Sequence, residues 1–138
     1  MKTEKSELIY NYTQKQAIED GYLLDAEAIA AVGGVDCPTP REAGIVHPVL
    51  ITSNLFNMYI KPSEEARAWG QSLNGRLWDV YYMFSLAARS CKDSMLTFKV
   101  IFQDGPKRQD KHEPTLWAIC NGGDDGKPVI TLMLPEDY

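Results

Sequence analysis

The sequence predicts a single α+β domain, in which several short N-terminal helices and one longer central helix pack on a C-terminal three-stranded antiparallel β-meander. Three observations lead to this prediction. Residues 76–90 repeat apolar side chains at helical spacing, residues 96–134 contain three runs with the two-residue period of strands, and glycine and proline divide the N-terminal half into short segments. The 138 residues correspond to about one domain, so we expect 1–138 to share one core.

Capping residues and glycine stops predict the short helices. Thr13 and Gln16 fit a capping box, and Gly21 follows as the stop of that helix. Asp25 is the expected N-cap of the next helix, which ends at Gly33. The predicted helical segments are 14–20, 25–33, 39–44 as a single turn, 53–60, and 63–70, while 22–24 and 47–51 are predicted to be extended.

The central helix is predicted from about Arg76 to Ser90, because apolar residues recur at three- and four-residue steps and form one stripe that must face a core. The stripe consists of Leu77, Val80, Tyr81, Phe84, Ala87 and Ala88. Strands are predicted over 96–102, 115–120 and 129–134 from their alternating side chains. The segment 104–114 between the first two strands is interpreted as a charged, solvated loop.

Composition narrows the class of protein. The chain has 14 Lys and Arg against 19 Asp and Glu, a net charge of -5, and no basic run, which argues against binding a nucleic-acid backbone. No apolar run approaches the roughly 20 residues of a spanning helix, and the polar start is unlike a signal peptide, so we expect a cytoplasmic protein that does not enter a membrane. The three cysteines show no C-x-x-C spacing and are interpreted as reduced thiols.

The turn Asn121–Gly126 contains three glycines and two adjacent carboxylates, Asp124 and Asp125. This composition indicates a tight hairpin turn with an anionic tip. The two carboxylates either decorate the hairpin, pair with Arg89 and Lys92 at the same end of the sheet, or contact a partner. The spacing of a calcium loop is absent, and we predict neither a metal site nor a cofactor.

Signatures of catalysis are also absent from the sequence. There is no G-x-S-x-G, H-E-x-x-H or Walker loop. His47 and His112 are the two histidines that could act as a general base. His47 precedes a proline and is interpreted as structural, and His112 lies in the charged loop. An enzyme is therefore the less favoured class.

Several ordered blocks resemble one domain-of-unknown-function family, whose members are encoded by bacteria, phages and plasmids. The resemblance brings no established activity and implies an accessory protein of a mobile element. The stretch Ala26–Pro40 is longer than the family's corresponding segment, and Asn121-Gly122-Gly123 stands where Gly-Pro-Gly is expected. The blocks are Ile9–Thr13 with Gln16–Gly21, Arg41–Ile45, Gly75–Val80, Cys120 with the Gly/Asp turn, and Pro128–Pro135.

Three hypotheses for function follow. The first is a small protein-binding module that contacts a protein partner, such as a host regulatory or defence component, through an acidic surface or a sheet face. The second is a small-molecule or nucleotide pocket between the central helix and the N-terminal tyrosines, with an arginine as the anion anchor. The third is a metal-assisted enzyme that uses the Asp124/Asp125 turn, or one that uses His112 as base. The candidate binding residues are Tyr10, Tyr12, Arg41, Arg76, Asp124 and Asp125.

Overall fold

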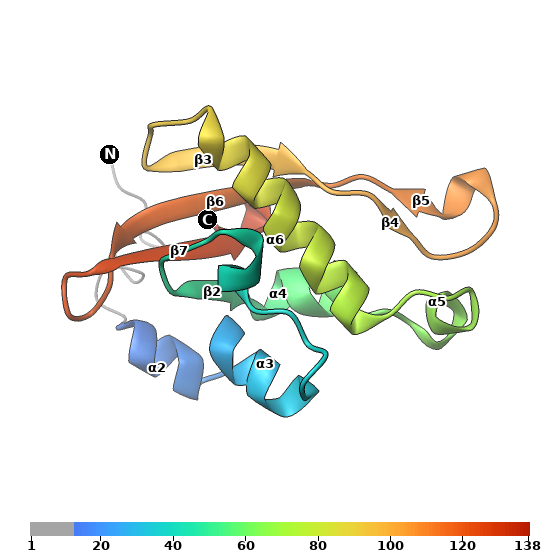
Figure 1. The fold of residues 1–138 in the computed structure, drawn as a ribbon, viewed down its shortest axis with the longest axis horizontal. Coiled ribbons are helices and arrows are strands. Elements are labelled where there is room, and N and C mark those ends of the chain that lie inside the picture. The colour runs from blue at the N-terminus through green and yellow to red at the C-terminus, as the bar shows by residue number, and fades with distance from the viewer. Residues whose placement is uncertain (1–12) are drawn as a thin grey trace.

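The computed structural model describes residues 13–138, which form a mixed α+β fold with helices packed on a five-stranded sheet (Figure 1). The strands are β1 (Leu23–Asp25), β2 (Val49–Thr52), β3 (Met95–Lys99), β4 (Phe102–Gln103), β5 (Lys111–His112), β6 (Thr115–Gly122) and β7 (Pro128–Met133). The helices are α2 (Gln14–Glu19), α3 (Ala26–Gly33), α4 (Ser53–Leu55), α5 (Glu64–Ala68) and α6 (Leu73–Arg89), joined by the short helical turns η1 (Pro40–Ala43), η2 (Phe56–Ile60), η3 (Arg108–Asp110) and η4 (Pro135–Asp137).

The sheet is larger than the sequence predicts. The strands β3, β6 and β7 pair antiparallel in the order of the predicted meander, but the sheet continues with β2 and β1, in the order β1-β2-β7-β6-β3. β2 runs parallel to β7, so the prediction of a three-stranded, wholly antiparallel sheet is wrong. All four residues of β2 are buried, because this strand lies inside the sheet and both of its faces are covered.

The helix α6 crosses one face of the sheet and supplies the centre of the core (Figure 1). Its predicted stripe is confirmed, since Leu77, Val80, Tyr81 and Phe84 are all buried. The helix begins three residues earlier than predicted. Ser72 is its N-cap, and its side chain accepts a hydrogen bond from a backbone N–H of the first turn at 3.0 Å.

The short N-terminal helices follow the caps that the sequence predicts. Thr13 and Gln16 form both hydrogen bonds of the capping box, at 3.0 and 3.2 Å, and Asp25 caps α3. The predicted helix over 53–60 is present, but its second half, η2, is a π-helix. No helix in residues 13–138 is long and apolar enough to cross a membrane.

The segment 104–114 is not the solvated loop that the sequence predicts. The short strands β4 and β5 pair antiparallel and form a hairpin closed by η3, and this hairpin projects beyond the end of the main sheet on the same side as α5 (Figure 1). Its position depends on contacts that reach back to α6. Those contacts bring together the polar side chains at the base of the hairpin.

Candidate functional site: an anchored basic hairpin

Arg76 lies at the end of the first turn of α6 and is 3% exposed, although it carries a full positive charge. A buried guanidinium needs hydrogen-bond acceptors, and the fold supplies four of them from three directions. Its acceptors are Tyr59 O at 2.7 Å, Asp104 Oδ1 at 2.7 Å, Gln71 Oε1 at 3.2 Å and Gln103 O at 3.4 Å. Arg76 therefore ties α6 to η2 and to the hairpin.

Aromatic rings cover the guanidinium from the side of the hairpin. The Cζ atom of Arg76 lies 5.5 Å from the centroid of the Phe102 ring, a cation–π distance. The Tyr59 ring stacks on Phe102 at 5.5 Å between centroids and 27° between planes. Phe102 is 1% exposed, so the first residue of the hairpin belongs to the core. The base of the hairpin is thus held by packing as well as by charge.

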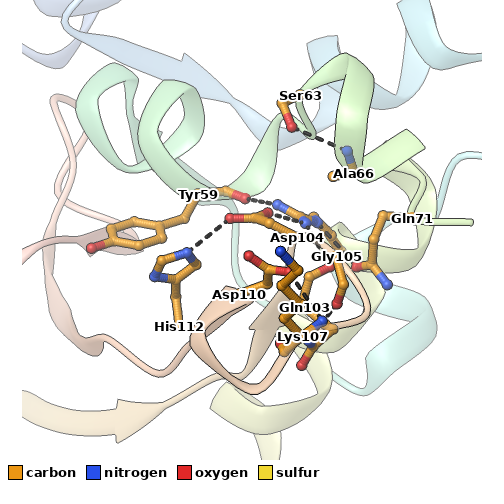
Figure 2. A network of polar contacts seen from close by, with 11 residues as sticks. Tyr59, Ser63, Ala66, Gln71, Gln103, Asp104, Gly105, Lys107, Asp110 and His112 are labelled. Atoms are coloured by element: carbon orange, nitrogen blue, oxygen red, sulfur yellow. Dashed lines mark hydrogen bonds and ion pairs between the residues drawn. The ribbon is translucent and has the colours of Figure 1, made fainter. Parts of the chain in front are cut away.

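Asp104 connects Arg76 to His112. Its second carboxylate oxygen, Oδ2, lies 3.1 Å from Nε2 of His112 (Figure 2). The side chains of Asp104 and His112 are 38% and 48% exposed, so this part of the network faces water. A carboxylate on one ring nitrogen orients the imidazole, and the other nitrogen, Nδ1, makes no hydrogen bond or ion pair among residues 13–138.

The turn of the hairpin is built from its own side chains. The amide of Gln103 donates to Gly105 O at 2.5 Å and to Lys107 O at 3.1 Å (Figure 2). Asp110 Oδ2 accepts the backbone N–H of Lys107 at 3.0 Å. A Cβ at position 105 would lie 2.5 Å from that same oxygen, so a larger residue there would displace the Asp110 side chain. These contacts give the turn one defined conformation.

The same contacts separate the charges of the hairpin. Asp104 pairs with Arg76 and His112, and Asp110 accepts a hydrogen bond from the turn backbone. The three cations of this segment are exposed and are named here the basic tip: Lys107, Arg108 and Lys111. Within 104–114 the formal charges balance, and Glu113, just after β5, is an exposed carboxylate. The outward surface of the turn is nevertheless cationic.

The two carboxylates of the β6–β7 turn have separate surroundings. Asp124 accepts the backbone N–H groups of Gln14 and Lys15, both at 3.1 Å, and so caps the first turn of α2. Asp125 accepts the N–H of Lys127 at 3.0 Å, a local turn contact. Among residues 13–138, neither carboxylate forms an ion pair with Arg89 or Lys92. The turn does lie at the same end of the sheet as the loop after α6, because Cys120 N donates to Ser94 O at 2.7 Å.

The other candidate residues lie elsewhere. Arg41 is exposed on η1, which packs against α6. Tyr10 and Tyr12 lie outside the described residues, and so does the pocket that the sequence places beside them. The structure therefore groups Arg76 with Asp104 and His112, and it places Arg41, Asp124 and Asp125 at other points. In residues 13–138, no group of three or more His, Cys, Asp or Glu side chains is arranged to hold a metal ion.

Sequence reasoning missed Asp104, Tyr59 and Gln103 as partners of Arg76. One signal could have found an acid: Arg76 stands next to Leu77 and one turn before Val80, on the stripe that faces the core. A buried arginine requires an anion. Identifying Asp104 as that anion would have required the hairpin to be recognised first.

The comparisons with known proteins place the chain in a family. No curated protein and no solved structure matches it. Residues 2–138 match the family described as "Family of unknown function (DUF6573)". This match spans nearly the whole chain, and the protein belongs to that family.

Proposed function

We propose that this chain is a protein-binding module that docks its basic tip onto an acidic surface of a partner protein. One observation carries the proposal: both aspartates of the hairpin are engaged in contacts within the protein, while Lys107, Arg108 and Lys111 are exposed. The arrangement presents a compact cationic surface on a chain with a net charge of -5. Opposite potentials across an interface speed encounter and select the partner.

The anchoring of the hairpin supports a role in recognition. A projecting turn that is already ordered loses little conformational freedom when it binds, so less of the interaction energy is spent on ordering it. Arg76 and Phe102 hold the base of the hairpin, and Gln103 and Asp110 hold its turn. The basic tip is therefore presented by a preorganised support.

A protein partner fits this surface better than a nucleic acid. Nucleic-acid binding rests on neutralising many phosphates, and the tip offers three cations beside the exposed carboxylate of Glu113. The three cations of the tip are enough to complement an acidic patch of similar size on a protein. The resemblance to proteins of phages and plasmids supports an accessory role, for which a host regulatory or defence protein is a suitable class of partner.

The experiment first identifies the partner and then tests the tip. A photo-crosslinking amino acid at position 108 in the native host should capture a partner that the same amino acid at position 41 does not capture. Position 41 is a matched control, because Arg41 is also an exposed arginine. The captured partner is then purified for direct binding measurements.

Charge reversal decides the proposal. The triple variant Lys107→Glu, Arg108→Glu, Lys111→Glu should slow association with the purified partner at least about tenfold, with an unchanged melting temperature. The control triple Arg41→Glu, Lys61→Glu, Lys127→Glu changes the net charge equally at exposed positions away from the tip. Equal losses in both triples, or no loss in either, would reject docking through the tip.

A further inference from the structure

The strand β3 is the outer strand of the sheet on the side away from β1 (Figure 1). It pairs with β6 along one side, and among residues 13–138 no strand lies along its other side. The opposite edge of the sheet, β1, has three residues, whereas β3 has five. The longer edge offers more backbone groups to an additional strand.

The hydrogen-bond pattern identifies which backbone groups of β3 face outward. Ser94 O accepts from Cys120 N at 2.7 Å, so the pair 94/120 is a hydrogen-bonded pair of the ladder. In an antiparallel ladder such pairs alternate with pairs that are not hydrogen-bonded to each other. The hydrogen-bonded pairs that follow are 96/118 and 98/116, which leaves residues 95, 97 and 99 facing the free edge.

The pairing of β6 with β7 confirms which residues of β6 bond to β3. Gly123 N donates to Lys127 O at 2.7 Å, which makes 121/129, 119/131 and 117/133 the hydrogen-bonded pairs between β6 and β7. Successive residues of β6 thus bond alternately to β3 and to β7, as in any antiparallel strand with a neighbour on each side. The outward groups of β3 are therefore those of Met95, Thr97 and Lys99.

These outward groups are unprotected within the described chain. Among residues 13–138, Met95 O accepts a long contact of 3.8 Å from Cys91 Sγ, and no hydrogen bond is made by the outward N–H groups of Thr97 and Lys99. The strand contains neither proline nor a bulge, the devices that usually block strand addition. Lys99 is its one charged residue.

The surroundings of the edge favour an acidic segment. Arg89, Lys92 and Lys99 are exposed and make no ion pair with the described residues, and Asp93 is the one carboxylate among them. This local excess of cations lies on a protein with a net charge of -5. A second β3 edge would bring the same cations together, so charge disfavours pairing of two copies.

A hollow of about 700 Å³ lies beside the strand, between it and the end of α6. Its lining includes the apolar Ala87 and Leu96, the polar Ser90 and Ser94, and one carboxylate, that of Asp93. Strand addition takes its affinity from main-chain hydrogen bonds and its selectivity from pockets that receive alternate side chains. The edge and the hollow together supply both features.

We propose that the free edge of β3 docks an extended, acidic segment of another protein, which adds to the sheet as a sixth strand. The inference does not depend on the basic tip, and its test changes none of the tip's residues. The edge would therefore be a second, separate docking surface.

The test uses a fluorescent seven-residue peptide of alternating glutamate and valine, with both termini blocked. Fluorescence anisotropy gives its Kd, and amide chemical shifts of Thr97 and Lys99 report where it binds. Two control peptides are used with the wild-type protein. One replaces every glutamate by lysine, and the other carries N-methyl groups on alternate residues, which keep the charge but remove the N–H donors of one strand edge. Both should bind at least about tenfold more weakly.

Variants at position 97 separate backbone pairing from general attraction. Thr97→Pro removes an outward N–H, which an edge strand tolerates, and should weaken the acidic peptide at least about tenfold. Thr97→Val keeps the N–H and should bind like the wild type. The variant Lys92→Glu, Lys99→Glu should also lose binding, which keeps the proposal testable if Thr97→Pro does not fold.

Three outcomes would overturn the proposal. One is the absence of amide shifts at Thr97 and Lys99 with millimolar acidic peptide. Another is equal binding of the N-methylated and unmodified peptides, which would show attraction without strand pairing. The third is a dimer of the chain alone that Thr97→Pro dissociates, because the occupant of the edge would then be a second copy.

Discussion

Arg76 donates to Asp104 at 2.7 Å across 28 residues of sequence, and the two side chains differ sharply in burial, at 4% and 38% exposed. The cation is therefore inside the protein and its anion is at the surface. Three further acceptors hold the guanidinium, so the position of Arg76 does not depend on Asp104 alone. The position of the hairpin, in contrast, depends both on Arg76 and on the packing of Phe102.

We predict that Arg76→Met lowers the free energy of unfolding by about 2–4 kcal/mol. The variant leaves the acceptors Tyr59 O and Gln103 O without their donor, and Asp104 recovers part of its hydration because it is already half-exposed. Urea denaturation measures the change. Arg41→Met is the control, since Arg41 is exposed, and it should cost less than about 0.5 kcal/mol. A loss of that small size for Arg76→Met would show that the network contributes no stability.

We predict that Phe84→Ala costs about 3–5 kcal/mol, because it leaves a cavity beneath the centre of α6. Phe84 is 6% exposed and meets the ring of Phe98 edge-on at 5.8 Å. Tyr82→Ala on the outer face of the same helix is the control. Tyr82 is 45% exposed and stacks on Trp78, so its loss should cost less than about 1 kcal/mol. Similar losses for both variants in denaturant melts would contradict the assignment of the buried face.

Local patterns explain why the sequence predicts α6 and the antiparallel pairing of β3 with β6 and of β6 with β7, although not the full sheet. A 3.6-residue stripe and a two-residue alternation are each complete within one segment, so Phe84 and Phe98 can be placed in the core without knowing what they meet. The parallel pairing of β2 with β7 leaves no such pattern. Val49–Thr52 is buried on both faces and reads only as a short apolar run, and its partner lies about eighty residues away.

The candidate site was predictable only in part, for the same reason. Arg76 carries a signal because a charge stands on an apolar stripe. Asp104 carries none, because an aspartate in a charged segment is normally solvated. The β4–β5 hairpin places Asp104 beside Arg76. The strands of this hairpin have two residues each and are too short to show a two-residue period.

We predict that Tyr81→Phe stabilises the protein by about 1 kcal/mol. Tyr81 is fully buried, and its hydroxyl has no hydrogen-bond partner within residues 13–138. Phenylalanine keeps the ring and removes a polar group whose desolvation is not compensated. Tyr82→Phe, at an exposed hydroxyl, should change stability by less than about 0.5 kcal/mol. A loss of stability in Tyr81→Phe would show that the hydroxyl does have a partner in solution.

The same substitution has a pH signature. Burial raises the pKa of Tyr81, and the negative charges of Cys37, Glu27 and Asp25 raise it further. The unfolded chain therefore releases this proton near pH 10 while the folded chain keeps it, so stability falls as the pH rises above about 10. Tyr81→Phe removes that contribution. Melts between pH 8 and 11 should show a smaller loss for the variant than for the wild type, and equal losses would contradict the assignment.

Asp124 and Asp125 are adjacent and similarly exposed, yet we predict different consequences for their replacement. Asp124 bonds the first two N–H groups of α2 with both carboxylate oxygens, across about 110 residues of sequence. Asn keeps one acceptor oxygen and loses the charge that favours a helix N-terminus, so Asp124→Asn should cost about 1 kcal/mol. Asp125 accepts one local N–H, and Asp125→Asn should cost less than about 0.5 kcal/mol.

Amide exchange at Gln14 and Lys15 is the sharper measurement, because α2 has six residues and can open without unfolding the sheet. Asp124→Asn should speed exchange of these two amides and leave the strand amides of β6 and β7 unchanged, whereas Asp125→Asn should affect neither set. High salt should weaken the effect of Asp124, since the interaction of its charge with the helix end is screened. Equal exchange in the two variants would mean that the turn does not cap α2, and that the two carboxylates are interchangeable.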